Sequence, residues 1–123
     1  EKLKPDMKKT DTKAFGSHSD IMPTLYEISL SSAAYWAAGV NMLSPEASNH
    51  TASNDLGIIV NKKCAVLYNF SSNSGRSYDW NKNKPREMVP CEETQEHRDM
   101  LKHYKSGVAI AQYMLKNDRA VVK

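Results

Sequence analysis

The residues best suited to acid–base or metal chemistry are the four histidines of the chain. Glu93 and His97 are four positions apart, and so are Asp99 and His103. On a helix such pairs share a face, where they form charge pairs or supply the first two ligands of a metal ion. A zinc site needs further ligands at suitable spacing, but the sequence has neither H-E-x-x-H nor a closely spaced cysteine pair. The pattern therefore predicts exposed charge pairs, with no metal and no cofactor.

A hydrolase of the ribonuclease type is the enzyme class that these residues allow. Cleavage of RNA needs groups that move protons and a cation that holds the phosphate. The candidates are His50 or His97, Glu92 or Glu93, and Arg76 or Arg86. Their spacing does not bring them together, and the chain lacks G-x-S-x-G, P-loop and dinucleotide motifs. The sequence favours a non-enzymatic protein, with a small secreted hydrolase as the alternative.

Cysteines and glycosylation sequons indicate an extracellular protein. A disulfide between Cys64 and Cys91, the only cysteines, would close a loop of roughly 28 residues and contribute about 3–4 kcal/mol. Two free thiols in a cytosolic protein are the alternative. The sequons at Asn49 and Asn69 are candidate glycosylation sites. The chain begins at Glu1 without an apolar leader, which we interpret as a processed, secreted protein or an excised segment.

The most apolar stretch of the chain, residues 21–43, predicts a helix. A T-x-x-E capping box begins at Thr24 and predicts a helix from Leu25. Pro45 would end this helix, because proline disfavours helical backbone in the residue before it. A short strand over 26–30, followed by a later helix, is the alternative.

This predicted helix is small on one side and aromatic on the other. Small side chains let helices approach closely, and Trp and Tyr favour membrane interfaces. We therefore predict that the helix contacts a membrane or a partner protein, or self-associates through residues 24–43. The residues predicted for that contact are Leu25, Ile28, Tyr35, Trp36, Val40 and Leu43. A core helix covered by the rest of the domain is the alternative.

The remaining elements are a hairpin, short strands and a late helix. Two runs of β-branched and aromatic residues around a polar turn predict a β-hairpin over 57–70. An amphipathic pattern predicts a second helix over 92–117, whereas residues 1–20 lack periodicity and predict a flexible arm. We therefore predict one α+β domain over 21–123, in which a small antiparallel sheet packs against two main helices as an α/β-sandwich.

Composition narrows the class of protein further. With 123 residues, 40% hydrophobic and 25% charged, the chain is one globular domain rather than a disordered or two-domain protein. Two cysteines exclude a dense disulfide scaffold. A net charge of +3 falls short of the basic surface of a nucleic-acid binder, although it favours encounter with an anionic membrane.

The chain resembles the small killer toxins of yeasts and smut fungi, which are often encoded by persistent viruses. The resemblance rests on the Ala/Gly-rich segment 31–40, the hairpin 57–70, and Cys64 with Cys91. It covers about residues 21–117 in layout. It implies a secreted antifungal toxin, an α/β-sandwich that damages the membrane or blocks a surface protein of susceptible cells, and it assigns no catalytic residue. A secreted effector that binds a host protein is the remaining alternative.

Overall fold

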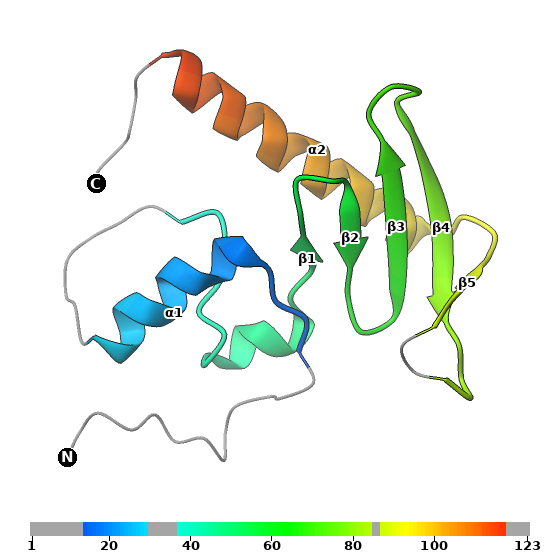
Figure 1. The fold of residues 1–123 in the computed structure, drawn as a ribbon, viewed down its shortest axis with the longest axis horizontal. Coiled ribbons are helices and arrows are strands. Elements are labelled where there is room, and N and C mark those ends of the chain that lie inside the picture. The colour runs from blue at the N-terminus through cyan, green and yellow to red at the C-terminus, as the bar shows by residue number, and fades with distance from the viewer. Residues whose placement is uncertain (1–13, 30–36, 85–86, 118–123) are drawn as a thin grey trace.

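The computed structural model describes residues 14–29, 37–84 and 87–117, and it is an α+β fold, as predicted (Figure 1). The helical elements are the 3-10 turn η1 (His18–Asp20), α1 (Ile21–Ile28), the 3-10 turn η2 (Pro45–Asn49) and α2 (Gln95–Lys116). The strands are β1 (Ala52–Ser53), β2 (Ile58–Val60), β3 (Cys64–Asn69), β4 (Ser74–Trp80) and β5 (Met88–Pro90).

The five strands form one antiparallel sheet in the order of the chain, β1-β2-β3-β4-β5. The predicted hairpin is confirmed as β2 and β3, with Ile59 paired to Val66. Gly57 precedes this hairpin with a φ of +82°, a backbone conformation that glycine adopts without steric cost. A Cβ atom at this position would also lie 2.4 Å from the carbonyl oxygen of Tyr68.

The hydrophobic core lies between the sheet and the first half of α2. Met100 and Tyr104, four positions apart on one helix face, pack against side chains of β2 and β3. The buried sheet residues of this cluster are Ile59, Cys64 and Val66. The predicted second helix is therefore confirmed, and its contact with β3 fixes the position of the residues in its first turn.

The helix predicted from Leu25 to Leu43 is wrong. The observed helix α1 ends at Ile28, residues 37–44 are not helical, and 30–36 lie outside the described residues. Thr24 does not cap a helix, because its hydroxyl donates to the Asp20 carbonyl (2.7 Å) and accepts from the Met42 N–H (3.0 Å). These bonds hold the returning chain beside the start of α1.

Gly39 allows this return. A Cβ atom on Gly39 would lie 2.2 Å from the carbonyl oxygen of Ser19, closer than any side chain tolerates. The next residue, Val40, donates its N–H to a carboxylate oxygen of Asp20 (2.8 Å). A long-range contact, rather than helical hydrogen bonding, therefore satisfies the backbone at this point.

Two residues of the predicted flexible arm, 1–20, are packed in the structure: Phe15 and Asp20. The Phe15 ring stacks on the Trp80 ring, with 5.2 Å between ring centroids and 7° between ring planes. Asp20, the last residue of the predicted arm, is buried. Residues 1–13 lie outside the described part of the chain.

Candidate functional site

The six residues predicted for a membrane or partner contact do not share one helix face. Leu25 and Ile28 are exposed on α1. Val40 and Leu43 are half-buried in the irregular segment that returns beside α1. Tyr35 and Trp36 lie outside the described residues. The predicted self-association through 24–43 would therefore have to use α1 rather than one long helix.

The second half of α2 also exposes large apolar side chains, which the sequence analysis missed. The apolar end of α2, residues 106–115, carries no charged side chain. Ile110, Tyr113 and Leu115 are all exposed there, and Leu115 is 83% exposed. In Figure 1 this orange-to-red half of the helix extends past β1, away from the sheet. The absence of charged residues from 106 to 115 is the sequence feature that could have predicted this apolar surface. Within the described segments no helix has the length and apolar character to cross a bilayer.

A cavity of about 670 Å³ lies between η1, the segment after η2 and α2. Three histidines line it: His18, His50 and His103. His50 was a predicted acid–base candidate, and its Nε2 lies 3.0 Å from the buried carboxylate of Asp20. A buried carboxylate fixes the orientation of an imidazole, as in enzymes that use histidine as a general base.

The other hydrolase candidates lie elsewhere. His97, predicted to be exposed, is only 2% exposed and packs in the first turn of α2. Arg76 is on β4. Glu93 forms an ion pair with Arg98 (3.3 Å) and not with His97. Glu92 is exposed ahead of α2, and Arg86 is outside the described residues. Among the candidates in the described part of the chain, the structure therefore brings none to His50.

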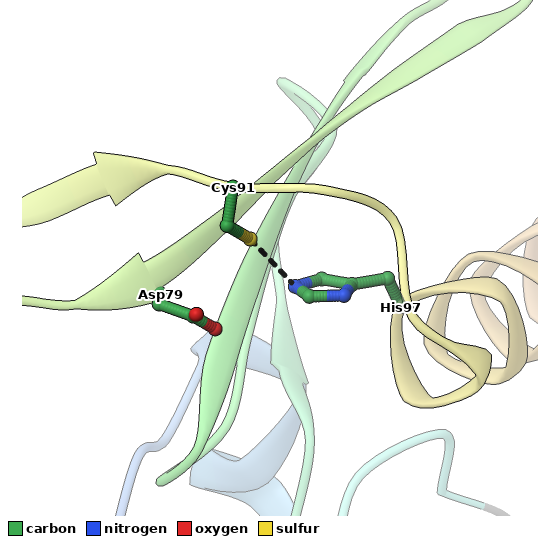
Figure 2. Close-up of side chains that lie close together, drawn as sticks. All are labelled: Asp79, Cys91 and His97. Atoms are coloured by element: carbon green, nitrogen blue, oxygen red, sulfur yellow. Dashed lines mark hydrogen bonds between the residues drawn. The ribbon is translucent and has the colours of Figure 1, made fainter.

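Cys91, His97 and Asp79 form a separate cluster at the start of α2 (Figure 2). The sulfur of Cys91 lies 3.8 Å from Nε2 of His97, and the ligand atoms of all three residues lie within 4.8 Å of one another. His97 takes the place usually held by Glu in a capping box, because its Nδ1 accepts the N–H of Thr94 (3.1 Å). The cap therefore fixes the imidazole next to the thiol.

This cluster is not arranged as a cysteine nucleophile. In a nucleophilic triad the carboxylate holds the imidazole, and the free imidazole nitrogen takes the thiol proton. Here Nδ1 of His97 faces Thr94, and Nε2 carries the proton that it donates to the Tyr78 carbonyl (3.3 Å). Burial, the charge of Asp79 and a hydrogen bond to that carboxylate raise the pKa of Cys91. Because the thiolate is the reactive form, these contacts suppress nucleophilic chemistry.

The predicted disulfide between Cys64 and Cys91 is not formed in the structure, where both cysteines are free thiols. Cys64 is paired across the sheet with Asp79 of β4, and Cys91 follows β5 on the far side of β4. Two strand spacings amount to about 10 Å, whereas the Cα atoms of a disulfide lie within roughly 7 Å. Burial and nearby carboxylates raise the pKa of Cys64 to about 11.

Both sequons lie at the surface. Asn49 is exposed at the end of η2, and Asn69 is exposed at the end of β3. The side-chain oxygen of Asn69 accepts the N–H groups of Ser71 (2.9 Å) and Ser72 (3.1 Å), so the amide nitrogen is the group left for a glycan. Glycosylation at Asn49 and Asn69 stays a prediction.

The layout on which the resemblance to killer toxins was based is present in part. The β2–β3 hairpin and the late helix α2 are formed, whereas the long Ala/Gly-rich helix is not. Residues 31–36 of that segment lie outside the described residues. The chain matches no protein-family model, no curated protein and no solved structure, so the resemblance stays a prediction.

Proposed function

We propose that the protein is a secreted, non-enzymatic toxin of the killer type, which binds the lipid surface of susceptible cells through the apolar end of α2. The observation that carries this proposal is the exposure of Ile110, Tyr113 and Leu115 on a helix segment without charge. Several large apolar side chains that stay exposed on one element of a folded domain mark it as a candidate interaction site.

The residue types at this end suit a lipid interface. Burial of a fully exposed Leu or Ile side chain stabilises by about 1.5–3 kcal/mol. Tyr113 adds an aromatic ring with a polar hydroxyl, a type enriched at the boundary between lipid and water. Lys116 follows the segment directly and is exposed, and basic side chains favour anionic headgroups.

A second apolar surface lies at the same end of the molecule. Ile21, Met22 and Leu25 are exposed on α1, although proline at position 23 is buried. In Figure 1 both α1 and the apolar end of α2 lie beyond β1, opposite to β5. Two apolar surfaces at one end favour an orientation in which the sheet points away from the lipid.

Vesicle binding tests this proposal. Leu115→Ser should weaken partition into vesicles of phosphatidylcholine and phosphatidylserine about 10-fold, the factor that corresponds to about 1.4 kcal/mol. The matched control is Leu56→Ser, because Leu56 is 73% exposed on the turn between β1 and β2. Leu56→Ser should bind like the wild type, and wild-type protein should release dye from the vesicles and inhibit the growth of sensitive fungal cells.

Three results would count against the proposal. Wild-type protein that neither binds vesicles nor inhibits growth would exclude a lipid-directed toxin. Equal loss of binding by Leu56→Ser and Leu115→Ser would show that the apolar end of α2 is not the contact. Cell binding that disappears after protease treatment of the cells would identify a surface protein as the target instead of lipid.

A hydrolase is the second candidate, because the cavity beside α2 is lined by three histidines and one of them is held by Asp20. The general base would be His50. If the protein cleaves RNA, His50→Gln should abolish the cleavage, whereas His97→Gln should affect it only through stability. Absence of cleavage by the wild type across the pH range in which histidine titrates would exclude this function.

A further inference from the structure

Three potential metal ligands converge from three separate segments at the start of α2. Asp79 belongs to β4, Cys91 follows β5, and His97 is in the first turn of α2 (Figure 2). The pairing of β4 with β5 sets Cys91 beside the strand that carries Asp79, because the Cys91 N–H donates to the Ser77 carbonyl (3.1 Å). The capping contact with Thr94 aims the imidazole of His97 at the sulfur.

The spacing of these atoms suits zinc. Zn–S bonds of about 2.3 Å and Zn–N bonds of about 2.0–2.1 Å at a tetrahedral angle place the two ligand atoms roughly 3.6 Å apart. The sulfur of Cys91 and Nε2 of His97 are 3.8 Å apart, so they reach this separation with almost no movement. The exposed carboxylate of Asp79 supplies the third ligand and closes the remaining distance by side-chain rotation.

The surroundings of His97 are suited to a bound ion. A histidine that coordinates zinc through Nε2 carries its proton on Nδ1 and donates it to a neighbouring oxygen. The hydroxyl of Thr94 lies 2.8 Å from Nδ1 and accepts that proton once the imidazole changes tautomer. Thr94 is exposed, so its backbone N–H then bonds to water.

We propose that Cys91, His97 and Asp79 bind a zinc ion, with water in the fourth position. The zinc–sulfur bond forms as the thiol S–H bond breaks, and the proton passes to solvent. The thiolate and the carboxylate together balance the two charges of the ion. Sequence spacing gave no sign of this site, because its ligands come together only through the pairing of β4 with β5 and the packing of α2.

Cobalt and zinc titrations of the reduced, full-length protein test the site. Cobalt should add a thiolate-to-metal charge-transfer band in the near ultraviolet, and zinc should displace the cobalt at one ion per chain. Cys91→Ala should lose the band and bind zinc more weakly by more than the roughly 10–100-fold that loss of a ligand's hydrogen-bond partner costs. Cys64→Ala is the matched control, because Cys64 is the other thiol on this face of the sheet.

Cys64→Ala should retain both the band and the affinity of the wild type. Asp79→Asn, an exposed position, should weaken binding without loss of the fold, and far-ultraviolet circular dichroism checks this. No charge-transfer band in the wild type would overturn the proposal, and so would loss of the band in Cys64→Ala but not in Cys91→Ala. A disulfide between the two cysteines in the natively purified protein would overturn it as well.

Discussion

Nε2 of His50 lies 3.0 Å from a carboxylate oxygen of Asp20, which is thirty positions earlier in the chain. The same carboxylate accepts the backbone N–H of Ser17 (2.6 Å) and that of Val40 (2.8 Å). Asp20 is 1% exposed. One buried side chain thus joins η1, the segment after Gly39 and His50, the residue that follows η2.

The hydroxyl of Ser17 also donates to the Asp20 carboxylate (2.9 Å), which makes four hydrogen bonds. Asp20→Asn should lower the free energy of unfolding by about 2–4 kcal/mol, because the amide cannot accept four hydrogen bonds and its NH2 group faces donors. Urea unfolding followed by circular dichroism measures this change. Asp55→Asn is the matched control at an exposed carboxylate, and its effect should stay within about 0.5 kcal/mol. Equal effects of the two substitutions would contradict the role assigned to Asp20.

Stability should also fall at acid pH in a way that depends on Asp20. Burial alone would raise its pKa, but the hydrogen bonds from Val40 and Ser17 and the charge of His50 hold the pKa below the ordinary 3.8. A lowered pKa in the folded state stabilises the protein above the ordinary pKa, and this contribution is lost as pH falls through the folded-state pKa. Below about pH 4 the stability of Asp20→Asn should therefore fall less steeply with pH than that of the wild type. Parallel curves would contradict the prediction.

Two neighbouring isoleucines on β2 should differ strongly in their contribution to stability. Ile59 is 0% exposed in the core, whereas Ile58 is 37% exposed on the opposite face. Ile59→Ala should cost about 2–5 kcal/mol, since it leaves a cavity among Met100, Val66 and Cys64. Ile58→Ala should cost clearly less. Thermal or urea unfolding of the two variants gives the comparison, and a larger loss for Ile58→Ala would contradict the observed register.

Substitution of two glycines by alanine should change stability in opposite directions. Gly39→Ala should destabilise by about 1–3 kcal/mol, because its Cβ would meet the backbone of Ser19. Gly107→Ala should stabilise by up to about 1 kcal/mol, because the added Cβ meets nothing within 4 Å and alanine favours helix. Differential scanning calorimetry measures both shifts. A stabilising Gly39→Ala would show that the chain does not return beside η1 as described.

Local patterns predicted those elements whose backbone hydrogen bonds are local, namely a hairpin closed by a short turn and a helix. The hairpin over 57–70 was predicted because its β-branched residues flank a polar turn, and the pairing of Ile59 with Val66 spans only that turn. The helix over 92–117 was predicted because Met100 and Tyr104 repeat at helical spacing. In both cases the apolar residues that form the sequence pattern are the ones that are buried in the core.

Prediction failed where a distant partner decides the backbone. The T-x-x-E pattern at Thr24 is local, whereas the acceptor of the Val40 N–H is Asp20, twenty positions away. The sequence did not predict the candidate zinc site for the same reason, because Cys91 and Asp79 come close only through strand pairing. His97 resembled half of an exposed charge pair, but its capping contact with Thr94 turns the imidazole inward.

Helix α2 carries the proposed ion site at one end and the proposed lipid contact at the other. From His97 to Leu115 the helix rises about 27 Å, well beyond the roughly 8 Å over which physiological salt screens charge. An ion added at the first turn therefore leaves the electrostatics of the last turn unchanged. In the double variant, the loss of zinc affinity should equal that of Cys91→Ala alone, and the loss of vesicle binding should equal that of Leu115→Ser alone. Each activity can therefore be removed from the protein while the other is kept.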